Sequence, residues 1–327
     1  MKNEFELYNP SSAKCGNIYA ANDANFDAAH LSQPLTEFAT GLTERNELAA
    51  TLELIAPSVP CGRSFSYKIF NEKLAYVSDA ANDADIREIG GDFATVTGPS
   101  SSADGRTDNK GLILVIDNDD GGEIPRVQQR AIASLTRRLL GSEIRRVLAL
   151  LEANDVNGSA LTPNWGSGNS ARNPDADLLA QIELSGTLRG ANPNIILCGS
   201  SAAVKRKSAL LGTSAPAAGG LLMLTDEQLA SWYGVDRFLT LDTVYQSAIS
   251  TKSRSLGDAI FVYHAAPNPM LDDPSNIKRF VTETAEGPLR AYVWPERKRT
   301  LLCVEHYSRI VCTSTLGILK IAPTYTA

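Results

Sequence analysis

One long helical pattern, residues 124–154, constrains the fold of this chain more than any other stretch. It reads IPRVQQRAIASLTRRLLGSEIRRVLALLEAN, and its proline sits where the first turn of a helix accepts one. At about 100° per residue, the apolar residues up to Leu139 form one stripe, and those after Gly141 form a second stripe rotated by roughly 150°. The pattern predicts either one long helix that kinks or changes partner near Gly141, or two helices that break there.

Upstream of this helix, the apolar residues recur with period two, which is typical of β-strands. The runs concerned are 62–71 (GRSFSYKIFN), 93–98 (FATVTG) and 111–118 (GLILVIDN). Residues 99–110 are rich in turn formers, so we expect a long β-hairpin with a flexible tip there. Because an isolated ribbon is marginally stable in water, this hairpin must pack on its own domain or be completed by a neighbour.

Downstream of the long helix, short helices and strands alternate. The sequence Asn-Pro-Asp at 173–175 predicts the start of a helix, and Gly190 predicts its end. Residues 195–198 read as a buried strand, and Ser200 or Ser201 is expected to cap the helix that follows. Further strands are expected at 258–265, 289–296, 307–312 and 316–321, a helix within 35–54, and a flexible link at 212–220.

The charge balance excludes one class of function. The 327-residue chain carries a formal charge of -6, which argues against a protein that grips nucleic acid over its whole surface but not against a shell that encloses it. Its five cysteines include no CxxC pair, so we expect reduced thiols in a cytosolic setting. The first residues lack the apolar segment of a signal peptide, and no apolar run is long enough to span a membrane.

No motif in the sequence predicts catalysis. Histidine is scarce and scattered, and His306 is expected on a strand surface. The acidic run 117–123 (DNDDGGE) lacks the ligand spacing of a calcium loop, and 198–203 (CGSSAA) lacks the second glycine of a nucleophile elbow. The basic run 205–207 (KRK) is expected on a solvated helix face. We therefore predict no enzyme activity, no catalytic residue, no cofactor and no metal site.

The order of these elements resembles that of a tailed-phage major capsid protein with the HK97-like fold. A polar arm, a long hairpin, a long helix, strand and helix units and a terminal strand follow one another over most of the chain. The stretches that carry the resemblance are 54–71 (LIAPSVPCGRSFSYKIFN), 84–120, 124–154, 163–212, 258–269 (DAIFVYHAAPNP) and 307–323 (YSRIVCTSTLGILKIAP). The most specific is 163–212, which combines a Trp/Gly loop, a helix opening at Pro-Asp, a Pro-Asn pair, a short strand and a further helix.

The resemblance implies an α+β fold in five parts. These are an N-terminal arm (1–50), an extended β-hairpin loop with its flanks (51–120), a peripheral domain with a spine helix (121–211), an axial domain (212–300) and C-terminal strands that return to the core (301–327). It also implies that the loop lies over an adjacent subunit, that the arm reaches beneath another, and that axial domains meet at capsomer centres.

The function that the resemblance implies is that of a structural subunit of an icosahedral bacteriophage capsid. Copies are expected to form pentamers and hexamers in the host cytoplasm and to enclose the double-stranded DNA genome in the virion without sequence-specific binding. Scaffolding, portal and decoration proteins are the expected partners, and no membrane is involved. Because the first 50 residues lack the charged helical scaffold segment of some relatives, either scaffolding is a separate protein or this is a mature form.

The expected contacts between subunits lie on the hairpin and on the long helix. They are Phe65, Tyr67, Lys68, Lys73, Arg106, Lys110, Arg126, Arg130, Arg137 and Arg138. Some relatives cross-link a loop lysine to an asparagine of a neighbour, but nothing in the sequence marks Lys68, Lys73 or Lys110 as reactive.

Three other functions compete with this one. An encapsulin-like compartment shell has the same fold and would enclose cargo enzymes in place of a genome. A small-molecule enzyme with an α/β core would need a cleft of titratable residues, which the sequence does not supply. A tail-tube or decoration protein fits the long helix and the two-domain length poorly.

Overall fold

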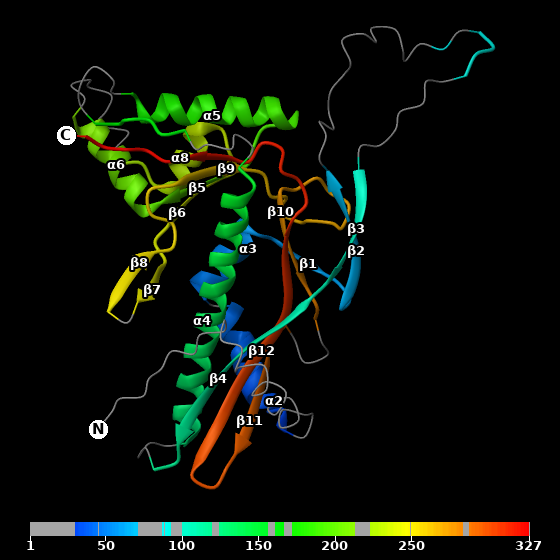
Figure 1. Ribbon diagram of the computed structural model, residues 1–327, viewed down its shortest axis with the longest axis vertical. Helices are drawn as coiled ribbons and strands as arrows, with labels where there is room; N and C mark the ends of the chain where they lie inside the picture. The colour runs from blue at the N-terminus through cyan, green and yellow to red at the C-terminus, as the bar shows by residue number, and fades with distance from the viewer. Residues whose placement is uncertain are drawn as a thin grey trace. The chain divides into compact units, whose positions relative to one another are not determined.

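The computed structural model of the protein describes most of the chain. The described residues are 30–44, 46–70, 87, 89–92, 100–119, 124–155, 161–166, 172–212, 223–248, 250–283 and 288–326. They form an α+β chain (Figure 1). Its contacts separate two compact units. The described part of the first unit lies within residues 30–46, 109–139 and 283–307, and that of the second within 47–108, 140–282 and 308–326.

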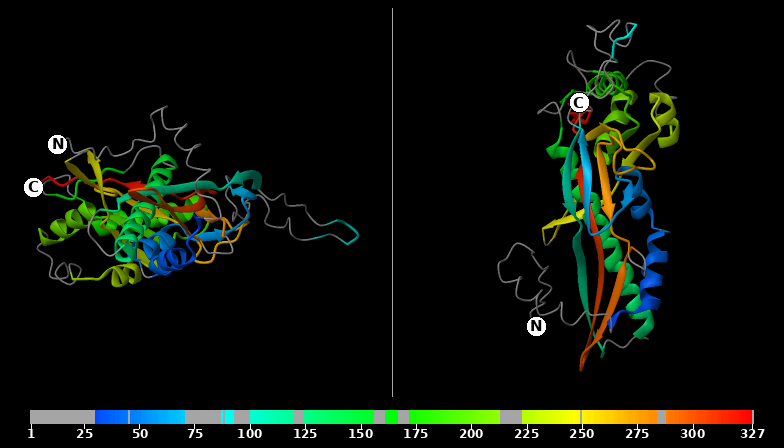
Figure 2. Two further views of the ribbon diagram at one scale, coloured as in Figure 1. Left: turned by 90° about the horizontal axis from the view of Figure 1, so that it is seen from below. Right: turned by 90° about the vertical axis from the view of Figure 1, so that its right-hand side faces the viewer.

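The first unit is a sheet covered on one face by two helices. Its strands are β4 (Asp108–Asp117), β11 (Arg290–Pro295) and the first part of β12 (Arg299–Cys312). β11 pairs antiparallel with β12, and β4 pairs with β12 as well. The helices are α2 (Gln33–Glu44) and the first half of α4 (Ile124–Ala153), which lie along the sheet (Figure 2). The core between them contains Leu35, Phe38, Ala39, Leu112, Leu114, Ile132, Leu135, Leu139, Leu289, Ala291 and Val304.

The chain segment that leads into α2 and the first turn of α2 are docked onto β11 by hydrogen bonds to its backbone. The Ser32 N–H donates to the carbonyl oxygen of Ala291 (3.0 Å), and Thr36 Oγ1 accepts from the Ala291 N–H (3.0 Å). Leu31 extends this contact through a β-bridge to Tyr292. These bonds satisfy backbone groups on a strand edge that would otherwise stay unpaired.

The second unit contains two larger sheets. The first joins β1 (Ser58–Pro60), β10 (Ile277–Val281) and the end of β12. Within it, β1 runs parallel to β10, and β10 runs antiparallel to β12. The second sheet has the order β13 (Leu319–Ile321), β9 (Ile260–Tyr263), β5 (Ile195–Gly199) and β6 (Arg237–Leu241). β5 pairs parallel with β6 and antiparallel with β9, and β13 pairs antiparallel with β9.

The β13-β9-β5-β6 sheet is buried on both faces, which explains its continuous apolar sequences. On one face, Leu197 and Phe261 pack with α3 (Glu47–Ile55) and with the second half of α4. On the other face, Ile196 and Val262 pack with three further helices (Figure 1). These are α5 (Pro174–Arg189), α6 (Ser200–Leu211) and α8 (Asp226–Tyr233). Every residue of β5 is buried, as expected for a strand covered on both sides.

Two hairpins complete the second unit. One joins β2 (Ser64–Phe70) to β3 (Ser100–Arg106), and the other joins β7 (Val244–Ala248) to β8 (Thr251–Arg254). Both pairs are antiparallel, and neither is extended by a third strand among the described residues.

α4 is one continuous helix that changes its packing partner, as one of the sequence interpretations predicted. Leu135 and Leu139 belong to the core of the first unit, whereas Leu140 and Ile144 belong to a core of the second. The alternative of two broken helices is wrong. Gly141 lies where the apolar stripe rotates, and nothing stands within 4 Å of the position that a Cβ would take there.

The observed hairpin differs from the predicted one. Residues 100–106, expected in a flexible tip, form β3 and pair with β2 along its whole length. β4 begins at Asp108, also inside the expected tip, and pairs with β12. Because serine, aspartate and glycine are poor strand formers, pairing with β2 must hold β3 in place. The run 93–98 lies outside the described residues.

Most other predicted elements are present. Asn173 caps α5, since its Oδ1 accepts from the Asp175 N–H (2.9 Å), and Gly190 ends the helix with a φ of 84°. The strands expected at 195–198, 258–265, 289–296, 307–312 and 316–321 are β5, β9, β11, the end of β12 and β13. The helix expected within 35–54 is two helices, α2 and α3. Most of the link expected at 212–220 lies outside the described residues.

The predicted serine cap of α6 is wrong. α6 begins at Ser200, its N-cap position is Gly199, and no side chain caps it. A Cβ at Gly199 would stand 2.2 Å from the carbonyl oxygen of Gly257, so a residue with a capping side chain does not fit at the N-cap.

Candidate interaction surfaces

The β2–β3 hairpin is a two-stranded ribbon that no further strand extends among the described residues (Figure 1). At the C-terminal end of β2, the Phe70 N–H donates to the carbonyl oxygen of Thr313 (2.8 Å). The apolar face of β2 packs on β10, where the ring of Phe65 stacks on Phe280 with centroids 4.2 Å apart. Among the described residues no third strand pairs with either edge, which leaves room for a strand of a partner.

The predicted contact residues Phe65 and Tyr67 lie on the face of β2 that packs on its own chain. Tyr67 is 8% exposed, and its ring lies 5.5 Å from that of Phe280. Phe65 is paired with Gly105 of β3, where an added Cβ would stand 2.7 Å from the Phe65 ring. A neighbouring molecule can therefore add little to the burial of Tyr67. The opposite face of β2, which carries the exposed Ser66, is the face open to a partner.

The basic residues predicted on the hairpin have different environments. Lys68 forms an exposed ion pair with Asp272 (3.6 Å). Arg106 is exposed at the end of β3, and Lys110 is half-buried on β4. Lys73 lies outside the described residues. Because an exposed ion pair contributes little to stability, Lys68 can exchange its partner at small cost.

A buried lysine holds the loop 267–275 in shape. The ammonium group of Lys278 donates to three backbone carbonyls of this loop, those of Met270 (2.5 Å), Leu271 (3.3 Å) and Asp273 (2.7 Å). Burial lowers the pKa of Lys278, and the charge of Asp273 opposes that shift. The loop presents Met270, which is 73% exposed, so a buried charge fixes an exposed apolar tip. The sequence did not single out Lys278, because a lysine inside the strand IKRFV carries no sign of burial.

Arg189 and His264 adjoin the same loop. Arg189 Nη2 donates to the carbonyl oxygen of Pro274 (3.1 Å), and burial lowers the pKa of Arg189 to about 10. Burial, followed by the positive charge of Arg189, lowers the pKa of His264 to about 4. His264 is therefore neutral at physiological pH, whereas Arg189 stays charged.

The four predicted contact residues of the long helix are all exposed on α4. They are Arg126, Arg130, Arg137 and Arg138. At 100° per residue, the first three lie within a sector of about 40°, and Arg138 widens it to about 120°. Within the described part of the chain, Arg130, Arg137 and Arg138 form no salt bridge. They thus form a cationic surface without a counter-charge on its own helix face.

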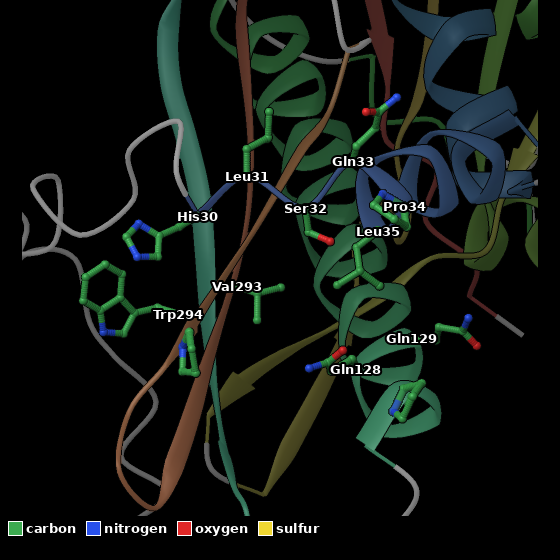
Figure 3. Close-up of a pocket in the computed structure, with 12 residues that line it drawn as sticks. His30, Leu31, Ser32, Gln33, Pro34, Leu35, Gln128, Gln129, Val293 and Trp294 are labelled. Atoms are coloured by element: carbon green, nitrogen blue, oxygen red, sulfur yellow. The ribbon is translucent and has the colours of Figure 1, made fainter.

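A pocket of about 900 Å³ opens in the first unit between the start of α2, the start of α4 and the end of β11 (Figure 3). Its lining residues are His30, Leu31, Ser32, Gln33, Pro34, Leu35, Pro125, Gln128, Gln129, Val293, Trp294 and Pro295. The ring of His30 packs against Trp294 with centroids 3.8 Å apart. Because the lining holds no carboxylate, lysine or arginine, it suits apolar and amide groups. No motif in the sequence predicts this pocket, since its walls come from three distant segments.

The prediction that the basic run 205–207 lies on a solvated helix face is wrong in part, because one of its three residues is buried. Arg206 is buried and binds Asp175 through Nε–Oδ1 (2.7 Å) and Nη2–Oδ2 (3.2 Å). The Tyr233 hydroxyl also donates to Asp175 Oδ1 (2.7 Å). The network joins α5, α6 and α8, and Lys207 alone of the run is exposed. Arg206 is buried because it lies on the face of α6 that meets α5, where the carboxylate compensates its charge.

The described residues contain no group of side chains arranged to hold a metal ion. His306, expected on a strand surface, is only 8% exposed, which corrects that prediction. The reason is its register, since alternation along β12 places it on the same side as Val304, a core residue. No described helix combines the length and apolarity needed to cross a membrane.

Comparisons with known proteins relate this arrangement to solved structures. No protein-family model and no curated protein matches the sequence. A phage-related protein from Bordetella bronchiseptica RB50 matches with a TM-score of 0.62 and 13% identity, over 89% of this chain and 96% of that chain. A virus-like particle from Pyrococcus furiosus matches with a TM-score of 0.49 and 10% identity, over 88% of this chain and 97% of that chain. The capsid of cyanophage P-SCSP1u matches with a TM-score of 0.47 and 8% identity, over 82% of this chain and 86% of that chain.

The likeness to the phage-related protein covers nearly the whole of both chains, so it concerns the complete fold rather than one unit. The chain is an α+β protein with the HK97-like fold, as the order of its elements predicted. At 13% identity the likeness concerns the fold, and the function has to be argued from the surfaces of this chain.

Proposed function

We propose that this chain is a structural subunit of an icosahedral bacteriophage capsid, whose copies assemble into capsomers and enclose a double-stranded DNA genome. The observation that carries the proposal is the β2–β3 hairpin, which no third strand extends among the described residues. Its apolar face packs on β10 of the same chain, so a neighbouring copy would bury the open polar face and pair the strand edges. The fold shared with a phage-related protein supports the same function.

The proposed contacts between subunits centre on the open side of this hairpin. Exposed Ser66 faces Asp104 across the strand pair, and Lys68 and Arg106 add positive charge beside them. Alternating charges of this kind suit a specific polar contact with a second copy, because they fix register as well as affinity. Lys73 and Lys110 remain predicted contacts between subunits, whereas the four arginines of α4 fit a polyanion better than a second subunit.

The parts of a capsid subunit are assigned here as proposals. The arm corresponds to 1–50, the extended loop to 51–120, the peripheral domain to 121–211, the axial domain to 212–300 and the returning strands to 301–327. The proposal places the protein in the virion after assembly in the host cytoplasm. Scaffolding, portal and decoration proteins are its proposed partners, and it assigns the chain no catalytic role.

Purification of the full-length chain followed by negative-stain electron microscopy tests the proposal. We expect closed shells of regular diameter, and only scattered small particles would contradict it. The contents distinguish two shells, because nuclease-protected DNA indicates a capsid, whereas bound protein cargo indicates an encapsulin-like compartment.

A matched pair of variants tests the hairpin contact. The double variant Lys68→Glu with Arg106→Glu reverses two exposed charges of the hairpin. We expect it to fold but to form few shells, because a reversed charge opposes its former partner across the contact. The control Lys252→Glu with Arg297→Glu makes the same change at exposed positions elsewhere and is expected to assemble normally. Equal assembly of both variants would remove the hairpin from the contact.

A further inference from the structure

We infer that the exposed face of α4 is a contact surface for the phosphate backbone of double-stranded DNA. The face is built from Arg126, Arg130, Arg137 and Arg138, all exposed. The inference rests on the proposed capsid function, because it names the polyanion that such a shell encloses. It adds a surface and a chemical partner to that function.

The spacing of the four arginines fits a linear polyanion. From Arg126 to Arg138 the helix rises about 18 Å, and the four side chains share a sector of about 120°. Each DNA strand carries one phosphate per about 3.4 Å of duplex axis, so each arginine can meet a different phosphate. A row of this kind lies along the polymer without any base-specific contact.

The residue types on this face also favour phosphate. All the cationic residues of α4 are arginines, although lysine forms helices about as well. The guanidinium group offers a planar fork of donors that matches the oxygens of a phosphate. In the chain from Ile124 to Ser142 there is no acidic residue, so no carboxylate within that stretch of the helix competes with the ligand.

The spaces between the arginines argue against a protein partner. On the same face stand Ala133, Ser134 and Gly141, and apart from the helix's own backbone and the residues next to Gly141, no atom lies within 4 Å of where a Gly141 Cβ would be. Protein interfaces are stabilised by buried aromatic and aliphatic anchors, and the one large apolar residue in this sector of the helix, the half-buried Val127, lies near its edge. Small residues between long cationic ones let a smooth, charged rod approach the helix closely.

The predicted affinity is moderate and depends steeply on salt. With four phosphate contacts, the logarithm of the binding constant should fall with the logarithm of salt concentration with a slope of about -3.6. Between 50 and 200 mM salt the affinity should then fall about 150-fold. Contacts this labile hold DNA against a wall without fixing it, which is compatible with a genome that must enter and leave.

Fluorescence anisotropy with a labelled 30-base-pair duplex of mixed sequence tests the inference. The protein is the full-length chain from its unassembled fraction, in which α4 is accessible. The triple variant Arg130→Gln, Arg137→Gln and Arg138→Gln leaves one arginine of the four, so its affinity should fall only about fourfold between 50 and 200 mM salt. The control, Lys252→Gln, Arg297→Gln and Lys298→Gln, removes the same charge from exposed positions elsewhere and should keep the wild-type slope.

Two results would overturn the inference. One is a triple variant that retains the wild-type salt slope, and the other is a control that loses as much of that slope as the triple variant does. Electron microscopy of the same proteins separates the alternatives. Variants that bind DNA normally but form no shells would assign the arginine face to contacts with another protein. A wild-type chain that never forms shells would count against the capsid function, whatever its affinity for DNA.

Discussion

Arg206 and Asp175 form a bidentate ion pair inside the second unit, with Nε–Oδ1 at 2.7 Å and Nη2–Oδ2 at 3.2 Å. The pair joins the first turn of α5 to the middle of α6, and Tyr233 of α8 shares the same carboxylate. Three helices that cover one face of a buried sheet are thus tied together by one charged contact. Such a contact positions the helices, and its loss leaves a charge without compensation.

The variant Arg206→Ala should therefore be strongly destabilised. Removing one member of a buried ion pair costs roughly 3–5 kcal/mol of unfolding free energy, because the carboxylate of Asp175 stays buried without its partner. Urea unfolding followed by circular dichroism measures this cost. The neighbouring Lys207→Ala changes an exposed residue and should stay within about 0.5 kcal/mol of wild type. Equal costs for the two variants would show that the ion pair has no special weight.

The pKa of His264 predicts a loss of stability in acid. Burial, then the charge of Arg189, lowers this pKa to about 4 in the folded chain, against 6.5 ordinarily. At a pH between these two values, His264 is protonated in the unfolded chain but mostly neutral in the folded chain. The free energy of unfolding therefore falls as the pH falls. Because the side chain is partly exposed and solvent screens its charge, we expect a loss of roughly 1–3 kcal/mol in the free energy of unfolding.

The variant His264→Gln should reduce this acid sensitivity. The measurement is the unfolding free energy at pH 7 and pH 4.5, taken for wild type and variant in the same salt. We expect the wild type to lose more stability than the variant over this interval. Parallel losses would mean that His264 titrates normally in the folded chain.

Gly105 is predicted to be required for the packing of the hairpin. An added Cβ would stand 2.7 Å from the Phe65 ring, and that ring cannot retreat because it stacks on Phe280 at 4.2 Å. Gly105→Ala should cost roughly 1–3 kcal/mol of unfolding free energy, as overpacking does. Gly62→Ala is the control, since its Cβ would meet only an ordinary contact at 3.5 Å. Chemical denaturation of both variants decides, and an unaffected Gly105→Ala would show that the ring moves freely.

Lys278 is predicted to maintain the shape of the loop 267–275. Lys278→Met removes the donor to three carbonyls, so the loop should open more often although the apolar volume is nearly kept. We expect amide hydrogen exchange in the loop to speed up at least about tenfold, equivalent to about 1.4 kcal/mol of opening free energy. Exchange in β5, which is buried on both faces, serves as the internal reference. Unchanged loop exchange would contradict the role of the lysine.

The sequence predicted those elements whose own residues specify them. The long helix, the cap at Asn173 and the end at Gly190 follow from local chemistry, so they are confirmed. The rotation of the apolar stripe near Gly141 also predicted the change of packing partner, because it records which side of the helix meets which core.

Elements that depend on distant partners were predicted less well. β3 has the composition of a turn, and only its pairing with β2 makes it a strand. A deletion of residues 100–109, which a flexible tip would tolerate, therefore removes a paired strand and should destabilise the folded subunit as well as its assembly. Arg206 was misplaced for the same reason, since its burial depends on Asp175, which is 31 residues away in the chain.

The candidate surfaces also differ in whether local sequence or distant segments determine them. The arginines of α4 are exposed, as an arginine-rich helix face suggests, because exposure follows from helical spacing alone. The pocket beside Trp294 and the buried Lys278 had no signal, because each is assembled from segments that only the fold brings together.

Sedimentation velocity of the purified full-length chain tests the central claim most directly, because it measures whether copies complete one another. We predict that most of the protein sediments as a uniform species of megadalton mass, many times the 35.1 kDa of one chain. A single species at the mass of one chain, stable at high protein concentration, would contradict it.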